Sequence, residues 1–358
     1  MGELYDDDEY YDSFYYSYDN GSTGTGAVVL CSKTDVLQFG AAFLPAFYYT
    51  IFLLSVVGNG LVLYIIYKYE KLSTVTNIFL LNLVVSDLIF ASSLPFWAVY
   101  HKSEWIFGSA LCKLVGSCYS ISFNSSILFL TLMTFDRYLA VVHAIASVQS
   151  RRRAYAFGSS AMVWVLSALA SIKDVTLLGV MEHSGGLLCE VTGYHQDVLT
   201  KWQLMGYYQQ FFLFFIVPLL IILYCYIRIT IRILSTPINA KHRAVKLILI
   251  IIFTFFICWT PYNVVILLKA IKTSFGDPND CSDTLDYAYY ITRNFAYLYC
   301  CICPVFYTFL GKKFQSHFLK LLSNCIPCMK MESMLLTHSS RNTSLRNQIQ
   351  TVEDLQGD

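Results

Sequence analysis

Long runs of apolar residues without charge dominate the pattern of this chain. Each run reaches the roughly 18 residues that a helix needs to cross the hydrocarbon core of a bilayer. Five runs contain no Asp, Glu, Lys or Arg: Val36 to Tyr67, Leu114 to Phe135, Ala154 to Ile172, Trp202 to Ile227 and Leu247 to Leu268. Two more contain one charge each, Asp87 within Leu72 to Tyr100 and Arg293 within Tyr287 to Gly311. Because a backbone in lipid must hydrogen-bond to itself, the pattern predicts an all-α membrane protein, a seven-transmembrane helical bundle.

Composition and charge agree with this interpretation and add an orientation. The chain is 56% hydrophobic and 14% charged, whereas a soluble domain is about 25% charged. Residues 1–32 contain seven acids and no Lys or Arg. The loops after the first, third, fifth and seventh spans are basic, with Lys68, Lys71, Arg151, Arg152, Arg153, Arg228, Arg232, Lys241, Arg243, Lys246, Lys312, Lys313 and Lys320. The positive-inside rule therefore predicts a cytoplasmic C-terminus and an extracellular N-terminus in the plasma membrane.

Four parts of the chain follow from these patterns. Residues 1–35 form an acidic, Tyr-rich extracellular tail, whose composition does not fold alone. Residues 36–311 form the bundle. Residues 312–328 alternate apolar and basic side chains, which predicts a short amphipathic helix on the inner membrane surface. Residues 329–358 form a cytoplasmic tail that contains Ser and Thr.

The cysteines and one sequon indicate processing. Four of the twelve cysteines fall in predicted extracellular segments, which suggests two disulfides with three pairings open: Cys31, Cys112, Cys189 and Cys281. Cys325 and Cys328 end the amphipathic stretch and favour palmitoylation over a metal site, because no second pair or His partner follows. Asn20 begins an Asn-Gly-Ser glycosylation sequon in the outer tail.

Polar residues inside the spans are candidates for function, because burying them in lipid is costly. Asp87 lies in the second span, and Asn59 and Ser126 are candidates to solvate it or a bound cation. The alternative is a protonated acid that only holds helices together. We favour a functional role for Asp87.

A second group of residues indicates that the cytoplasmic end of the helical bundle changes conformation. Asp136-Arg137-Tyr138 ends the third span, where an acid–base pair that breaks on a helix shift makes a switch. An interfacial snorkelling arginine is the alternative. Proline removes a backbone hydrogen bond and permits a kink, and three spans combine a proline with a nearby Tyr or Trp. They are Pro218 with Tyr226, Trp259 with Pro261, and Pro304 with Tyr307. We expect Pro218 and Pro304 to interrupt the fifth and seventh spans.

Together these motifs resemble the rhodopsin-like G-protein-coupled receptors. Asn59, Asp87, Asp136-Arg137-Tyr138, Trp164, Pro218, Cys258-Trp259-Thr260-Pro261 and Pro304 with Tyr307 fall one group to a span, in the order of that family. Residues 136–144 and Ser93-Leu94-Pro95-Phe96-Trp97 resemble chemokine receptors. Most chemokine receptors have Glu at the position of Arg293, whereas the XC (lymphotactin) type has Arg. The chain resembles the XC type most.

The resemblance implies disulfides Cys112–Cys189 and Cys31–Cys281, and a small, basic secreted protein as the ligand. The acidic tail suits such a partner, and its tyrosines resemble sulfated ones: Tyr10, Tyr11, Tyr15, Tyr16 and Tyr18. The ligand's N-terminus is expected in a pocket of Tyr48, Trp97, Tyr119, Asp174, Tyr262 and Arg293. Packed core aromatics are the commoner fate of such tyrosines. Asp174 and a ligand carboxylate are both candidate partners for Arg293. Inside the cell the resemblance implies an inhibitory-type G protein, calcium signalling and chemotaxis, with receptor kinase and arrestin acting on the tail.

Two departures from the family qualify this expectation. Cys303 stands where the family has Asn, and Tyr299 stands where His or Asn is usual. Both weaken the polar network around Asp87, which puts a sodium ion there in doubt; no other cofactor is expected. They also leave open an atypical, chemokine-scavenging receptor. The seventh span has no Lys that could form a Schiff base with retinal, so we do not expect a retinal-type pump. No span contains a pair of Asp residues, a Ser–His couple or a His-Glu-x-x-His motif, so we do not expect an intramembrane enzyme.

Overall fold

The computed structural model describes residues 34–70, 72, 74–143, 153–183, 186–192, 196–234, 242–275, 284–310, 315–318 and 320–321. Several predicted sites therefore lie outside the described residues: Tyr10, Tyr11, Tyr15, Tyr16, Tyr18, Asn20, Cys31, Cys281, Cys325 and Cys328. Of the predicted amphipathic helix at 312–328, residues 315–318, 320 and 321 are described, and all are helical. The chain divides into two compact units, Met1–Val305 and Phe306–Asp358.

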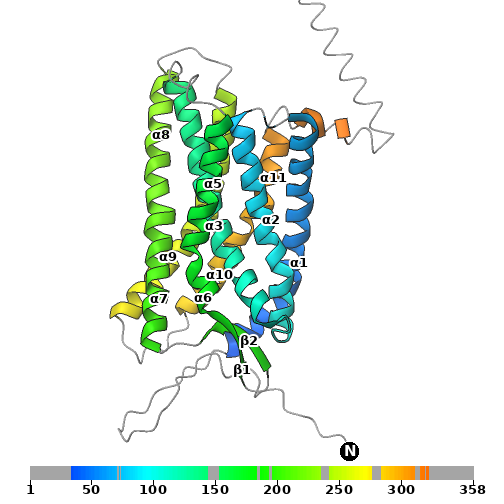
Figure 1. Ribbon diagram of the computed structural model, residues 1–358, viewed down its shortest axis with the longest axis vertical. Helices are drawn as coiled ribbons and strands as arrows, with labels where there is room; N and C mark the ends of the chain where they lie inside the picture. The colour runs from blue at the N-terminus through cyan, green and yellow to red at the C-terminus, as the bar shows by residue number, and fades with distance from the viewer. Residues whose placement is uncertain are drawn as a thin grey trace, which may run out of the picture. The chain divides into compact units, whose positions relative to one another are not determined.

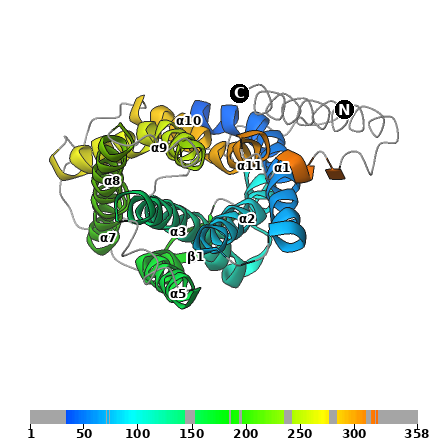
Figure 2. The same cartoon turned by 90° about the horizontal axis from the view of Figure 1, so that it is seen from above.

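The first unit is a bundle of long helices that run side by side (Figure 1), which confirms the predicted seven-transmembrane fold. The elements are α1 (Thr34–Ile65), η2 (Ile66–Glu70), α2 (Val75–Lys102), α3 (Gly108–Val142), α5 (Arg153–Ala170), α6 (Ile172–Leu177), β1 (Leu178–His183), β2 (Gly186–Val191), α7 (Gln196–Tyr208), η3 (Gln209–Ile216), α8 (Val217–Leu234), α9 (His242–Phe275), α10 (Thr284–Tyr297) and α11 (Tyr299–Leu310). Seen along the helices, α3 lies in the middle, with α2, α5, α8 and α9 around it (Figure 2).

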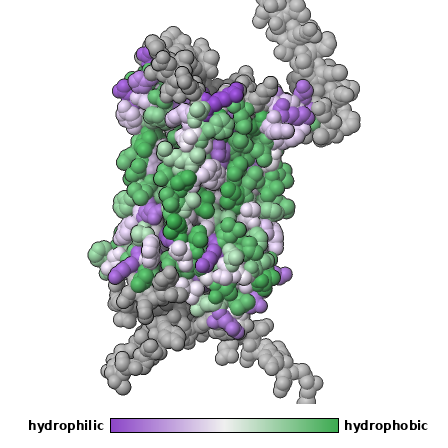
Figure 3. Space-filling view, viewed as in Figure 1, coloured by the Kyte–Doolittle hydropathy of each residue, from purple (hydrophilic) through white to green (hydrophobic). Residues whose placement is uncertain are grey.

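The outward faces of the helices are apolar. Side chains such as Leu53, Val57 and Leu220 are exposed by more than half. Figure 3 shows apolar residues along the middle of the bundle and polar residues gathered near its two ends. In water such a surface would be unfavourable, whereas lipid accepts it without cost. The pattern therefore fits a bundle that stands in a bilayer.

Two of the seven predicted spans are each built from two helices. Within the described residues, five helical segments are by themselves long and apolar enough to cross a membrane. The fourth span is α5 followed by α6, which join at Ser171, and the seventh is α10 followed by α11. The seventh span breaks at Leu298, so the prediction that Pro304 interrupts it is wrong. Pro218 lies two residues after the end of the π-helical η3, where the fifth span does change geometry.

Pro304 remains inside α11 because α1 takes over its missing hydrogen bond. Proline has no N–H for the carbonyl four residues earlier, here that of Cys300. The Asn59 side chain donates from Nδ2 to this carbonyl oxygen at 2.9 Å. Gly58 permits the close approach, because a Cβ at that position would lie 3.0 Å from Cβ of Pro304. The pair Gly58-Asn59 therefore holds the seventh span against the first.

A short hairpin closes one end of the bundle. β1 and β2 pair antiparallel from Leu178 opposite Val191 to His183 opposite Gly186. The predicted disulfide between Cys112 and Cys189 is present and joins the start of α3 to β2, with the two Cα atoms 5.6 Å apart. The backbone N–H of Trp105 also donates to the carbonyl of Leu187 at 2.7 Å. The hairpin is thus fixed both to α3 and to the loop that precedes it.

Candidate functional site

A ring of tyrosines surrounds Arg293 at the hairpin end of the bundle. Arg293 donates from Nε to Oη of Tyr297 at 2.6 Å, and its guanidinium lies 5.7 Å from the centre of the same ring. Other phenols act electrostatically on it: Tyr48, Tyr262, Tyr289 and Tyr290. Within the part of the chain that is described, no carboxylate reaches salt-bridge distance of Arg293. The side chain is therefore a partly buried cation held by dipoles and rings, without a contacting carboxylate among the described residues.

Most of the predicted ligand pocket comes together in this ring. Tyr48 and Tyr119 both pack on Tyr297, with ring centres 6.1 Å apart in each case, and Tyr119 meets Tyr262 edge-on at 6.2 Å. Trp97 packs against the same cluster and also against Trp105 beneath the hairpin, at 5.7 Å. These residues come from five helices, α1, α2, α3, α9 and α10.

Asp174 does not join this group. Its carboxylate forms an ion pair with Lys173, its sequence neighbour, at 2.7 Å. Of the two candidate partners for Arg293, Asp174 is therefore already engaged. The second carboxylate oxygen of Asp174 is buried without a hydrogen bond among the described residues.

The residue that the sequence did not reveal is Glu190, which follows the disulfide Cys189 on β2. Its side chain is partly buried beneath the hairpin, and the Arg293 charge acts on it. Burial raises the pKa of the Glu190 carboxyl to about 7, against the opposing pull of Arg293. A lone acid in a predicted loop has no periodic pattern around it, so no sequence signal identified it.

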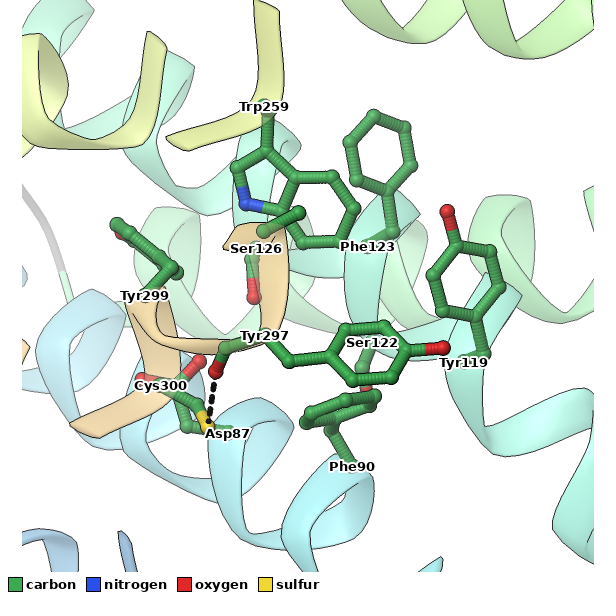
Figure 4. A pocket seen from close by; sticks show the side chains of 11 residues that line it. Asp87, Phe90, Tyr119, Ser122, Phe123, Ser126, Trp259, Tyr297, Tyr299 and Cys300 are labelled. Atoms are coloured by element: carbon green, nitrogen blue, oxygen red, sulfur yellow. Dashed lines mark hydrogen bonds between the residues drawn. The ribbon is translucent and has the colours of Figure 1, made fainter. Parts of the chain in front are cut away.

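A small cavity of about 20 Å³ lies deeper in the bundle (Figure 4). Asp87 and Ser126 line it, as the sequence predicted for a polar core. Asn59 does not line it; its side chain instead binds Ser55 at 3.0 Å and the Cys300 carbonyl. Ser126 shares its hydroxyl with Ser86 at 2.9 Å, within a group of serines that joins α2 to α3.

The cavity offers few ligands for a hard cation. Such ions prefer several oxygen atoms, but the wall consists mainly of aromatic rings and the thiol-bearing Cys300, whose Sγ donates to the Tyr297 carbonyl at 3.0 Å (dashed in Figure 4). Cys303, which stands where the resembled family has Asn, is fully buried and does not line the cavity. The donor set therefore fits a sodium ion poorly. The described residues also contain no group of three or more His, Cys, Asp or Glu that would hold a metal.

Trp259 connects the tyrosine ring to this cavity. It stands on α9 two residues before Pro261, and its ring lies 4.5 Å from Phe123 and 6.1 Å from Tyr119. Its indole N–H has no hydrogen-bond acceptor among the described residues. Trp259 therefore contacts both Tyr119 of the outer cluster and Phe123 of the cavity wall.

At the opposite end of the bundle, Arg137, Asp136 and Thr76 contact one another, and we call this group the arginine lock. Arg137 forms an ion pair with its neighbour Asp136 at 3.4 Å, and both contact the hydroxyl of Thr76 on α2. The Asp136 side chain is 3% exposed and that of Arg137 is 20% exposed. Thr76, which the sequence did not single out, therefore bridges α2 to both charged residues.

Tyrosines surround the lock. Tyr138 shares a hydrogen bond with Nε2 of His143 at 3.0 Å and packs on Tyr224. Tyr226 on α8 lies within electrostatic range of Arg137, and its buried hydroxyl has no hydrogen-bond partner in the described segments. Tyr307 belongs to α11, but its side chain lies outside the described positions.

Trp164 holds the fourth span to the second: its indole N–H donates to Oδ1 of Asn82 at 2.8 Å.

The bundle thus has a cluster of tyrosines about Arg293 at one end and the contacts of Arg137 with Asp136 and Thr76 at the other. Residues 58–307 match the family described as 7 transmembrane receptor (rhodopsin family). The C-C chemokine receptor type 3 of Cavia porcellus is 36% identical over 313 residues, 85% of this chain and 87% of that protein. The human C-C chemokine receptor type 4 is 35% identical over 82% of this chain and 82% of that protein. The human C-C chemokine receptor type 1 is 35% identical over 83% of this chain and 84% of that protein. The chain belongs to the rhodopsin family of seven-transmembrane receptors and, within it, to the chemokine receptors, which are receptors and not enzymes.

Proposed function

We propose that this chain is a chemokine receptor of the XC (lymphotactin) type, which responds to a small basic secreted protein by activating an inhibitory-type G protein. Calcium signalling and chemotaxis follow from that coupling. The observation that carries the proposal is the partly buried cation Arg293 at the centre of the outer tyrosine ring. Most chemokine receptors have Glu at this position, so its charge favours the XC type over the C-C type.

The proposed signal runs from the ring to the lock. The ligand's N-terminal segment enters beneath the hairpin and contacts Arg293 and the rings of Tyr119 and Tyr262. Displacement of Tyr119 repacks Trp259, whose α9 helix contains Pro261 and bends there at low cost. The movement favours a state in which Arg137 leaves Asp136 and Thr76 and meets the G protein.

In this proposal the acidic tail 1–35 faces outward and the basic loops face the cytoplasm. Sulfation at Tyr10, Tyr11, Tyr15, Tyr16 and Tyr18 would strengthen capture of a basic ligand, and Asn20 would be glycosylated. A second disulfide would join Cys31 to Cys281. On the inner side, palmitoylation at Cys325 and Cys328 would anchor the helix, and receptor kinase and arrestin would act on the tail.

The direct test is a calcium and cyclic-nucleotide assay of cells that express the receptor, challenged with a panel of chemokines. We expect the XC chemokine to produce a calcium rise and a fall in cyclic AMP, both abolished by Arg137→Ala at equal surface level. A response only to C-C chemokines would contradict the XC assignment.

The second candidate is a scavenging receptor that binds chemokines without strong G-protein coupling. Cys303 favours this second function, because its buried thiol stands near Asp87 where the family has the amide of an Asn. The same cells separate the two functions: uptake of labelled chemokine without any calcium rise would support scavenging. The intact lock of Asp136, Arg137 and Thr76 supports the signalling receptor.

A further inference from the structure

The π-helical segment η3 of the fifth span begins with two consecutive glutamines that bind two different helices. Gln209 donates from Nε2 to the Ala170 carbonyl, the last of α5, at 3.1 Å. Gln210 donates from Nε2 to Oη of Tyr119 on α3 at 3.2 Å. Short π-helical segments within α-helices frequently occur at functional sites. This one joins a single turn of the fifth span to both the fourth and the third.

The Gln209 bond fixes this turn to the fourth span. That span breaks at Ser171, where the Asp174 N–H donates to the Ser171 carbonyl three residues earlier, at 3.1 Å. The Ala170 carbonyl, four residues before Asp174, accepts from Gln209 on another helix. A buried carbonyl without a partner costs free energy, so Gln209 stabilises the break. The backbone beside Gln210 is therefore held independently of Tyr119.

The Tyr119 ring is the meeting point of three helices. Its centre lies 6.1 Å from the ring centres of Trp259 and Tyr297, and 6.2 Å from that of Tyr262. Figure 4 shows Tyr297 pointing toward Tyr119 at the edge of the cavity. A shift of Tyr119 therefore changes the packing of the sixth and seventh spans together.

The Tyr119 hydroxyl also belongs to a chain of polar contacts across the outer pocket. It shares a hydrogen bond with Tyr262, whose hydroxyl donates to Tyr289 at 3.4 Å. Tyr289 in turn hydrogen-bonds to the Arg293 side chain. Gln210 is the end of this chain on the fifth span, and Arg293 is the end on the seventh.

We propose that Gln210 is a positioning residue that holds Tyr119 in its resting place and so sets how readily the receptor signals. The inference rests on the proposed function, in which displacement of Tyr119 repacks Trp259. The structure that contains the Gln210–Tyr119 bond also contains the closed arginine lock. Because Gln209 keeps the turn beside α5, movement of Tyr119 breaks its bond to Gln210. The bond therefore stabilises the resting state relative to the active state.

The test is ligand-free G-protein turnover of the full-length receptor in cell membranes, at matched surface level. Gln210→Leu removes the bond and keeps most of the side-chain bulk. We expect it to raise basal turnover by about threefold or more, which is the worth of one hydrogen bond between helices in a membrane. Tyr119→Phe should also raise basal turnover, because it removes the same bond together with the one to Tyr262. Gln210→Leu should add nothing in the Tyr119→Phe background, which isolates the contact in a double-mutant cycle.

Gln203→Leu is the matched control. Gln203 donates from Nε2 to Oη of Tyr207 at 2.8 Å, the same pair of groups, but within its own helix α7 and at an exposed position. Its loss should leave basal turnover unchanged. A rise in Gln203→Leu as large as that in Gln210→Leu would overturn the inference, because any lost Gln–Tyr bond would then have the same effect.

Two further results separate failure of the inference from failure of the proposed function. Basal turnover of Gln210→Leu equal to that of the parent, or an undiminished effect of Gln210→Leu in the Tyr119→Phe background, would overturn the inference. Turnover of the parent in response to the chemokine panel is measured in the same membranes. Absence of that response to every chemokine would instead overturn the proposed function.

Discussion

The two partly buried arginines of this receptor, Arg137 and Arg293, are compensated in opposite ways. At the inner end, Arg137 contacts a carboxylate and a hydroxyl of its own chain, those of Asp136 and Thr76. At the outer end, Arg293 contacts a phenol and aromatic faces, and no carboxylate within the described residues. A charge in a bilayer needs a partner. The difference indicates that the inner cation is held in a resting state, whereas the outer cation is prepared for a partner from outside.

The largest expected effect is at the outer cation. Arg293→Glu reverses the charge that the ligand meets, and loss of one buried charge contact costs roughly 2 kcal/mol or more. We expect the half-maximal ligand concentration for calcium release to rise by at least about 30-fold. Lys102→Glu makes the same charge change at an exposed position of α2 and serves as the control. A shift of equal size in both variants would show that only the overall charge matters.

A variant of the arginine lock should have the opposite phenotype, a gain of signalling without ligand. Thr76→Val removes the hydroxyl that bridges Asp136 and Arg137, a bond to charged groups worth roughly 1.5 kcal/mol. Ligand-free G-protein turnover should therefore rise, by up to about tenfold, with ligand affinity little changed. Thr131→Val is the matched control on α3, because its hydroxyl bonds only to the Ile127 carbonyl of its own helix. Unchanged basal turnover in Thr76→Val would remove Thr76 from the lock.

These two regions also show what the sequence predicts and what it does not. The apolar runs and the single charges within them gave the seven spans, and the Asp136-Arg137-Tyr138 motif located the inner lock. Which side chains face each other was not predictable, because helix rotation is set by packing between segments far apart in the chain. Asn59 therefore binds the Cys300 carbonyl instead of lining the cavity of Asp87, and Thr76 and Glu190 were missed.

The break in the seventh span has the same explanation. Proline inside a span suggested an interruption at Pro304, but a partner on another helix repaired the lost bond. The chain instead changes direction at Leu298, where Leu298 accepts from both Cys301 and Ile302. Nothing in the local sequence around Leu298 is a helix breaker. The position of the break is a property of the packed bundle.

A third, smaller effect is expected at the contact between α1 and α11, which joins Asn59 to the Cys300 carbonyl. Asn59→Ala leaves the Cys300 carbonyl without its 2.9 Å donor from Asn59. Hydrogen bonds between helices in a membrane are worth about 0.6–1.7 kcal/mol, so the detergent-solubilised receptor should unfold at a lower temperature by a few degrees. Asn263→Ala is the comparison, because the Asn263 amide donates within its own helix, to Trp259. Equal loss in both variants would argue against a special role for the α1–α11 contact.

The smallest effect is expected in the core between the two arginines. Cys303→Asn restores the amide of the family beside Asp87, in a fully buried position. The added donor and acceptor change the balance of resting and active states, so ligand-free G-protein turnover should differ from the parent by about twofold, an effect of under 1 kcal/mol. Equal turnover in mutant and parent, at matched surface level, would count against a role for this position.

The central claim is that the outer cation receives the ligand and the inner cation holds the resting state, as two ends of one equilibrium. Ligand-dependent G-protein turnover of the double variant Arg293→Glu/Thr76→Val tests this most directly. The account predicts the raised basal turnover of Thr76→Val together with the weakened ligand response of Arg293→Glu. A double variant with the basal turnover of the parent would contradict it, because Arg293 would then be needed for activation even without a ligand.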